Sequence, residues 1–301
     1  MNNIRLMAID WGTTVARAYA MDREGRVVRS VRGDFGVQKI AHGDFASALA
    51  ELRNHDMRDV PVLACGMIGS RQGWVEAPYC VCPAGFDDIA GKLTAVPDAL
   101  FSIVPGLVCH DDDVPDVMRG EETQIIGALS PDSRERRVVV LPGTHSKWAL
   151  VEAERITTFA TFMTGELYAV LREHSILGRL ADAGDDLVAL ERGLRRSLRT
   201  AATLSHDLFS TRTLALTGSL AAHSVGDYLS GLLLGAELAG ARAWLARHDA
   251  SDAEVTLVGD EALCERYARA LAMIGKVASH ASADAAARGL WRIACHAGIV
   301  K

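Results

Sequence analysis

The sequence lacks a basic excess and any long hydrophobic run. Its 301 residues carry a formal net charge of −6, which argues against a general nucleic-acid-binding protein because such proteins present a basic face. The apolar run Leu232–Leu234 is soon broken by Glu237 and Arg242, well short of the roughly 20 apolar residues that cross a bilayer. The apolar run before Asp10 is too short for a signal peptide. We therefore expect a cytoplasmic protein with no nucleic-acid or membrane partner.

The sequence also lacks paired cysteine motifs. None of its six cysteines belongs to a C-x-x-C motif with a matching partner, so we expect reduced and mostly buried thiols. The tract Cys109–Asp113 lacks the ligand spacing of a zinc site, and a polar loop is the favoured interpretation. The arginines of the 192–199 segment alternate with acids and helix formers, which predicts a solvated helix face.

A phosphate-type motif is present at the N-terminus. The apolar run Ile4–Ile9 leads directly into Asp10 and a Gly12-Thr13-Thr14 turn. Glycine lets a ligand approach the backbone closely, and the threonine amides and hydroxyls can donate to phosphate oxygens. Asp10 could hold Mg²⁺ through water, because magnesium keeps several waters in protein sites. An ordinary hairpin turn is the competing interpretation of this motif.

The same design recurs in the middle of the chain. The apolar run 137–141 leads into the turn Gly143-Thr144-His145-Ser146-Lys147, and a further strand follows. Each copy reads as strand, Gly-Thr turn, strand, tight turn and strand, which indicates an internal duplication. We expect the two turns to hold a polyphosphate from both sides, with Lys147 as a point charge on a phosphate.

An acidic pair lies between the two copies. Gly120 precedes Glu121 and Glu122, which open a predicted short helix with apolar Ile125 and Ile126. A carboxylate at this place could accept the proton of an attacking hydroxyl, as acids do in phosphoryl transfer. The alternative is that both acids only complement the positive end of the helix dipole.

Together these elements resemble the sugar-kinase branch of the actin, hexokinase and heat-shock ATPase superfamily. Several stretches are similar to the 2-dehydro-3-deoxygalactonokinase family: Ala8–Thr14, Gly66–Ser70, Gly73-Trp74, Ala77–Tyr79, Val104–Leu107, Val117–Gln124, Pro142–Trp148 and Met163–Leu167. Weaker agreement continues to residue 290, so the resemblance covers nearly the whole chain. It implies ATP-dependent phosphorylation of 2-dehydro-3-deoxy-D-galactonate on its terminal C6 hydroxyl, a step of galactonate catabolism.

The resemblance also implies an architecture. We expect an α/β, two-lobed actin-like ATPase fold of duplicated ribonuclease H-like lobes, with the nucleotide in a cleft between them. The expected lobes are residues 1–134 and 135–284, and the helix at about 285–301 is expected to pack back on the first lobe. The cofactors implied are ATP and Mg²⁺. Gly259 stands where many relatives carry a Gly-Gly adenosine motif, so the adenine pocket is less securely placed.

Site residues follow from the matching motifs. Relatives place a Gly-Asp pair where Gly120-Glu121 stands, so either Glu121 or Glu122 is the expected base, and Glu121 is preferred. Asp10, Gly12, Thr13, Thr14, Gly143, Thr144, His145, Ser146, Lys147 and Gly259 are the expected ATP-binding residues.

The substrate implied is an anion and the chain is acidic, so local cations must recruit it. The expected sugar-acid residues are Arg17, Gly69, Ser70, Arg71, Trp74, Tyr79 and Arg119. Arg71 is the first choice for a two-pronged contact with the carboxylate, against the alternative of a surface ion pair. Trp74 and Tyr79 could cover the carbon chain or simply pack in a loop.

Two alternatives stay open. The same chemistry could act on another sugar acid or a neutral sugar. A nucleotide-gated sensor on the same scaffold would phosphorylate no small molecule, and it would leave Glu121 and Glu122 without a purpose. The sequence specifies neither oligomeric state nor regulation.

Overall fold

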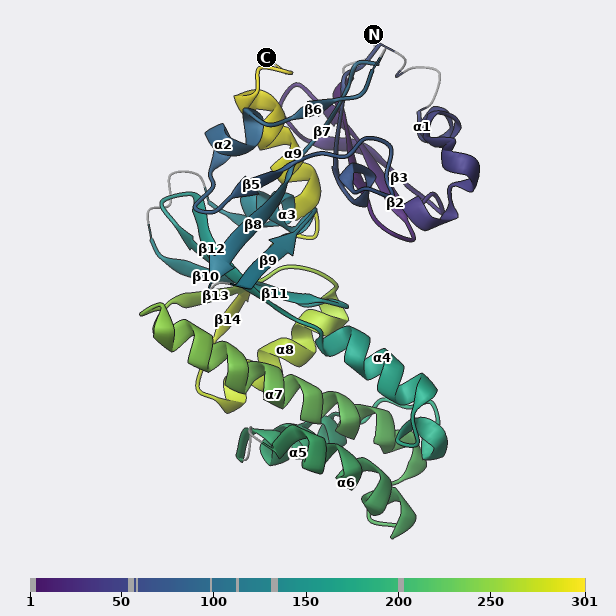
Figure 1. Cartoon of the computed structure of the whole chain (residues 1–301), viewed down its shortest axis with the longest axis vertical. Coiled ribbons are helices and arrows are strands. Elements are labelled where there is room, and N and C mark those ends of the chain that lie inside the picture. Colours follow the sequence, from purple (N-terminus) through teal and green to yellow (C-terminus); the bar gives the residue numbers. More distant parts are fainter. Residues whose placement is uncertain are drawn as a thin grey trace. The chain divides into compact units, whose positions relative to one another are not determined.

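The structure of the chain is a computed structural model, and it describes residues 4–53, 57, 59–97, 99–111, 114–130, 135–199 and 203–300 (Figure 1). The chain divides into two compact units. Unit 1 comprises Met1–Glu135, Ala149–Phe159 and Ala281–Lys301, and unit 2 comprises Arg136–Trp148 and Ala160–His280. Residue 134, the expected end of the first lobe, lies outside the described residues.

Unit 1 is built on a six-stranded sheet with the order β3-β2-β1-β4-β7-β6. Its strands are β1 (Ile4–Trp11), β2 (Ala16–Asp22), β3 (Val27–Gly33), β4 (Val62–Gly66), β6 (Thr94–Ala95) and β7 (Phe101–Ile103). Strand β1 pairs antiparallel with β2 and parallel with β4, and Leu6–Ile9 are completely buried. A strand covered on both faces needs consecutive apolar residues, which the sequence supplies here.

Four α-helices accompany the sheets of unit 1: α1 (Phe45–Leu52), α2 (Phe86–Ala90), α3 (Glu121–Ala128) and α9 (Ala285–His296). The side chain of Asp44 caps α1 by accepting a hydrogen bond from the amide of Ser47. Helix α9 packs against α2, α3, β1 and β4. A Cβ atom on Gly127 of α3 would lie 1.8 Å from the carbonyl oxygen of Ala285, so α3 and α9 touch backbone to backbone. This contact fixes the position of α3.

A smaller sheet of unit 1 leads into α3. Its strands are β5 (Tyr79–Val81), β8 (Gly106–Asp111) and β9 (Val114–Met118), in the order β5-β8-β9. Strand β8 pairs parallel with β5 and antiparallel with β9. Only Arg119 and Gly120 connect β9 to α3, so these two residues and the first turn of α3 are held by sheet and helix together.

The second large sheet repeats the topology of the first. Its order is β12-β11-β10-β13-β14, with β10 (Arg137–Leu141), β11 (Ser146–Glu152), β12 (Arg155–Phe162), β13 (Glu254–Leu257) and β14 (Ala278–His280). In both sheets three consecutive strands lie in sequence order, and the first pairs in parallel with a later strand, β4 or β13. The strand-turn-strand repeat predicted from the sequence is therefore confirmed.

Five of the described α-helices belong to unit 2. They are α4 (Thr164–His174), α5 (Leu187–Arg199), α6 (Leu204–Leu216), α7 (Val225–Arg247) and α8 (Glu261–Met273). Helices α5 and α6 both pack against the long α7 (Figure 1). A Cβ atom on Gly193 of α5 would lie 2.2 Å from the carbonyl oxygen of Tyr228, so α5 and α7 also meet at their backbones. Within the described ranges, no helix has the length and apolar character needed to cross a membrane.

Candidate active site

Asp10 is the last residue but one of strand β1, in a polar corner of unit 1. It lies opposite Arg17 of β2 and Cys65 of β4, and Nη1 of Arg17 is 3.8 Å from Oδ2 of Asp10. Burial raises the pKa of Asp10, and the positive charge of Arg17 opposes that shift. A carboxylate held at the edge of solvent with one weak cationic partner can take a hydrated cation.

The first Gly-Thr turn is held by backbone hydrogen bonds. The amide of Gly12 donates to the carbonyl of Val15 at 2.9 Å, which closes the turn. The amides of Val37 and Gln38 donate to the carbonyls of Gly12 and Thr13 at 3.0 and 3.1 Å. These backbone hydrogen bonds hold the turn in one conformation, which is suited to binding a phosphate group.

The acidic pair opens α3 in a strained and crowded place. Gly120 has φ of +110°, a conformation that favours glycine, and a Cβ there would lie 3.1 Å from Cα of Gly66. Glu121 is half-buried, and its Oε2 accepts from the amide of Arg119 at 3.0 Å. Glu122 is completely buried and accepts from the amide of Gly120 at 2.7 Å and from the hydroxyl of Thr123 at 3.0 Å.

The two acids differ in their electrostatics. Burial, and then the neighbouring charge of Glu121, raise the pKa of Glu122 to about 7. Glu122 has no exposed surface and both of its carboxylate oxygens are bonded locally, whereas Glu121 reaches solvent. Of the pair, Glu121 is therefore the one that an incoming hydroxyl can approach.

Arg119 contributes a buried guanidinium with unused donors. Its Nη2 donates to the carbonyl of Ala77 at 2.8 Å, and its Cζ lies 4.4 Å from the ring centroid of Tyr79. Its Nε and Nη1 are buried without a partner among the described residues, as is Oγ of Ser70. Gly69 completes the group, because a Cβ there would lie 3.0 Å from Nη1 of Arg119.

A buried donor without a hydrogen-bond partner is rare, and each one lowers stability by roughly 1–3 kcal/mol. Nε and Nη1 of Arg119 and Oγ of Ser70 are therefore typical of a site that a polar ligand completes. Four of the seven expected sugar-acid residues, Gly69, Ser70, Tyr79 and Arg119, belong to this group. Arg17 lies instead beside Asp10.

The other two expected sugar-acid residues have different surroundings. Arg71 is 87% exposed and its Nε lies 3.0 Å from Oε1 of Glu76. Trp74 stacks on Phe45 at 6.1 Å between ring centroids and meets Phe101 edge-on at 5.3 Å. Arg71 thus has the surface ion pair that was its alternative interpretation, and the ring of Trp74 packs against the core of unit 1.

The second Gly-Thr turn opens on a cavity of about 550 Å³ within unit 2. Gly143 and Thr144 line it together with residues from α4, α7 and α8. His145 bonds through Nε2 to the carboxylate of Glu166 and does not line the cavity. Lys147 is buried, and its Nζ donates to the hydroxyl of Thr161 at 2.9 Å.

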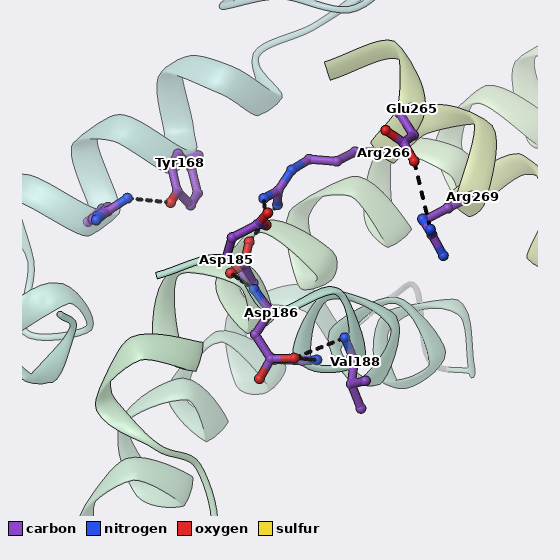
Figure 2. A network of polar contacts seen from close by, with 10 residues as sticks. Tyr168, Asp185, Asp186, Val188, Glu265, Arg266 and Arg269 are labelled. Atoms are coloured by element: carbon purple, nitrogen blue, oxygen red, sulfur yellow. Dashed lines mark hydrogen bonds and ion pairs between the residues drawn. The ribbon is translucent and has the colours of Figure 1, made fainter. Parts of the chain in front are cut away.

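The far side of this cavity carries a charged network. Arg266 of α8 bonds Oδ1 of Asp227 through Nη1 at 2.5 Å and Oδ1 of Asp185 through Nη2 at 2.8 Å (Figure 2). Asp227 is 5% exposed, and its second oxygen accepts from the amide of Asp186 at 2.7 Å. Asp186 in turn accepts from the amides of Val188 and Ala189, the first turn of α5.

Sequence patterns did not single out Asp227, Arg266, Tyr168 or Arg172, which all line the cavity. Gly259 lies two residues after the end of strand β13, with φ of +147°. It does not line the cavity, but the next residue, Asp260, does. Asp260 also caps α8 by accepting from the amide of Leu263. An aspartate directly before the helix-forming run 261–273 is a typical N-cap pattern and is a sequence signal for this side of the cavity.

A buried carboxylate supports the second turn from below. Glu237 of α7 is 2% exposed and accepts from Nε1 of Trp148 and from the hydroxyl of Tyr267, both at 2.8 Å. Because the proton of Tyr267 is used on Glu237, the 2.6 Å contact between Ser146 and Tyr267 has Ser146 as donor. Oγ of Ser146 is then left to accept from the amide of Gly143, at 3.4 Å.

This chain of bonds gives the network a direction. Burial raises the pKa of Glu237, and the hydrogen bonds that it accepts oppose the shift. While Glu237 is ionised it can only accept, so every donor in the network points away from the turn and towards α7. Ser146 and Lys147 use their side chains to bond Tyr267 and Thr161 beneath the turn, whereas Gly143 and Thr144 line the cavity.

The sequence profile of the 2-keto-3-deoxy-galactonokinase family matches residues 10–293. The chain belongs to this family. It is 39% identical over 298 residues to the 2-dehydro-3-deoxygalactonokinase of Escherichia coli (strain K12), an alignment that covers 97% of this chain and 98% of the relative. The family expected from the sequence motifs is confirmed.

Solved structures agree with the family and the fold. A crystal structure from Sinorhizobium meliloti, provisionally named a 2-dehydro-3-deoxygalactonokinase, has a TM-score of 0.86 at 37% identity and covers 96% of this chain and 98% of that chain. The Clostridium difficile activator of 2-hydroxyisocaproyl-CoA dehydratase, solved with bound ADPNP, has a TM-score of 0.52 at 14% identity, over 97% of this chain and 95% of that chain. The expected α/β actin-like ATPase fold is thus confirmed.

Proposed function

We propose that the chain transfers the γ-phosphoryl group of ATP to the C6 hydroxyl of 2-dehydro-3-deoxy-D-galactonate. Family membership supports this substrate, and so does the name of the Escherichia coli relative, a 2-dehydro-3-deoxygalactonokinase. The observation that carries the proposal is Arg119, whose buried Nε and Nη1 have no partner among the described residues. The carboxylate of a sugar acid would accept from one of these donors, and a second oxygen of the ligand would accept from the other.

Glu121 is proposed as the general base. Its carboxylate is accessible and bonded to the amide of Arg119, so base and anion-binding group belong to one short segment. It would orient the acceptor hydroxyl and take its proton during attack on the phosphorus. Glu122 is proposed to hold the β9-α3 connection through the amide of Gly120.

The cavity of unit 2 is proposed to bind the nucleoside of ATP, with the phosphates at Gly143 and Thr144. The Gly12–Thr14 turn is proposed to contact the terminal phosphates. Asp10 suits magnesium, because one carboxylate ligand together with phosphate oxygens would leave room for the waters that the ion keeps. Magnesium would neutralise charge on the transferring group, and the residues of the chain would supply positioning.

An ADP-release assay with a panel of acceptors tests the proposal. We expect ATP turnover to depend on 2-dehydro-3-deoxygalactonate and to be much slower with its gluconate epimer and with neutral hexoses. The same slow hydrolysis with and without every acceptor would overturn the proposal and favour a nucleotide-gated sensor. Faster turnover with another sugar acid would keep the kinase and replace its substrate.

A further inference from the structure

A second charged cavity lies in unit 2, apart from every residue that we assign to ATP or the sugar acid. Its volume is about 490 Å³, and it is lined by α5, α6 and the first turn of α7. Arg192, Arg196 and Arg199 come from α5, and His206 comes from α6. The sequence predicts a solvated face for these arginines. In the structure Arg192 and Arg199 are exposed and Arg196 is half-buried, and all three line the wall of one open cavity.

The three arginines share one face of α5, because their spacing of four and three residues stacks side chains along a helix. Like charges at this spacing repel each other, so the arrangement costs stability unless anions compensate it. Among the described residues, Asp207 compensates part of this charge: Nε of Arg196 lies 2.7 Å from its Oδ1, and its side chain is 3% exposed.

Among the described residues, Arg192, Arg199 and His206 of this cavity form no ion pair. Arg192 donates to the carbonyl of Ser219 at 2.8 Å and lies over the ring of Tyr228, 5.8 Å from its centroid. Arg199 and His206 have no hydrogen-bond or ion-pair partner in the part of the chain that the structure describes. The protein has a net charge of −6, so this local concentration of positive charge around a cavity favours the binding of an external anion.

We infer that this cavity binds a phosphorylated metabolite of about sugar-phosphate size, with the phosphate dianion held by Arg192, Arg196 and Arg199. Planar guanidinium groups match phosphate oxygens two at a time, which suits a cluster of arginines better than a surface of lysines. The volume falls within the range typical of small-molecule sites, roughly 300–1,000 Å³. Leu214 and Tyr228 would cover the uncharged part of the ligand.

The cavity is distinct from the proposed nucleotide pocket, although both touch α7. Tyr228 lines the arginine cavity, whereas the preceding residue, Asp227, lines the nucleotide pocket and bonds Arg266. Adjacent residues of a helix point about 100° apart, so the two cavities open on different sides of α7.

Isothermal titration calorimetry on the full chain tests the inference. The protein is first saturated with a non-hydrolysable ATP analogue and magnesium, which fills the proposed nucleotide pocket. The probes are inorganic phosphate and glucose 6-phosphate, and glucose is the uncharged match. The variant is Arg199→Gln, which removes no described contact and so leaves the fold intact. The matched control is Arg195→Gln, because Arg195 lies on the same helix, pairs with Glu191 at 2.9 Å and does not line the cavity.

We expect both phosphate probes to bind the wild type and Arg195→Gln, and glucose to bind neither. Arg199→Gln should weaken both probes about ten-fold, the loss of one charge-assisted contact. Equal affinities for Arg199→Gln and Arg195→Gln would overturn the site, and so would the absence of binding by either phosphate probe at millimolar concentration. Kinase turnover without added phosphate is expected to be the same in both variants, so failure here is distinguishable from failure of the proposed function.

Discussion

The two Gly-Thr turns share one strand pattern, yet different chemistry supports them. In unit 1, backbone amides of Val37 and Gln38 hold the carbonyls of Gly12 and Thr13. In unit 2, a chain of side chains runs from Gly143 through Ser146 and Tyr267 to the buried carboxylate of Glu237. A repeated sequence pattern therefore predicts the shape of a turn and leaves open what holds it.

The units also differ in the chemistry gathered around each turn. Unit 1 carries the acids Asp10, Glu121 and Glu122 and the buried guanidinium of Arg119. Unit 2 carries the large cavity with its Arg266 network. Changes at Glu121 and Arg119 of unit 1 should therefore alter the chemical step and the sugar-acid KM, and changes around the second turn and cavity of unit 2 should alter the KM for ATP.

The largest effect is expected from Glu121→Gln. Loss of the proposed base should lower kcat about 100-fold or more, because general bases commonly contribute that much. Coupled ADP release at saturating substrates measures it, with unchanged circular dichroism as the check on folding. Glu51→Gln, on the exposed surface of α1, is the matched control and should stay near wild type. A few-fold loss for Glu121→Gln would remove this residue from the mechanism.

The next largest effect is expected from Arg119→Lys, which should change the KM for the sugar acid and not the KM for ATP. Lysine keeps the charge and loses the planar pair of donors, so the KM for the sugar acid should rise about 10- to 100-fold. The KM for ATP should hardly change. Arg71→Lys is the matched control and should change either KM less than about two-fold, because Arg71 is 87% exposed. A larger effect from Arg71 would restore it as the carboxylate-binding residue.

Glu122 should make unit 1 sensitive to pH. Its folded pKa of about 7 lies above the usual value of 4.5, so its contribution to stability is complete at low pH and is lost as pH rises through that interval. Between pH 5 and 7 this loss is about 2 kcal/mol for one group with these two pKa values. Urea unfolding of wild type and Glu122→Gln at both pH values measures the difference. If the free energy of unfolding changed equally with pH in the wild type and in Glu122→Gln, the raised pKa of Glu122 would be contradicted.

The smallest of these effects is expected from Glu237→Gln in unit 2. A glutamine amide can donate to Tyr267, which would reverse the hydrogen bonds that reach Gly143 and misplace the turn. The KM for ATP should rise about ten-fold, the cost of one or two hydrogen bonds, with the sugar-acid KM unchanged. Asp22→Asn, a buried carboxylate in unit 1, is the control and should leave the ATP KM unchanged. A rise in the sugar-acid KM alone would break the proposed division between the units.

Local patterns in the sequence predicted much of the fold. The paired strand-turn-strand segments predicted three strands of each large sheet, β1–β3 and β10–β12. These elements are predictable because hydrophobic period, caps and glycine turns are local properties of the chain.

The candidate site was less predictable, because it depends on side-chain directions and distant partners. Arg119 and Arg71 look alike in the sequence, yet one is buried beside Ala77 and Tyr79 and the other pairs with Glu76 at the surface. Lys147 follows a glycine-threonine turn and is nonetheless buried against Thr161. Asp227 and Arg266 come from two helices far apart in the sequence, and no motif joins them.

The most direct test of the account is to identify the phosphorylated product. The full chain is incubated with ATP, magnesium and 2-dehydro-3-deoxygalactonate, and the mixture is followed by phosphorus and carbon NMR. The account predicts one phosphomonoester, coupled to the C6 protons, for each ADP formed. ADP accumulating with free phosphate and unmodified sugar acid, or an ester at another carbon, would contradict it.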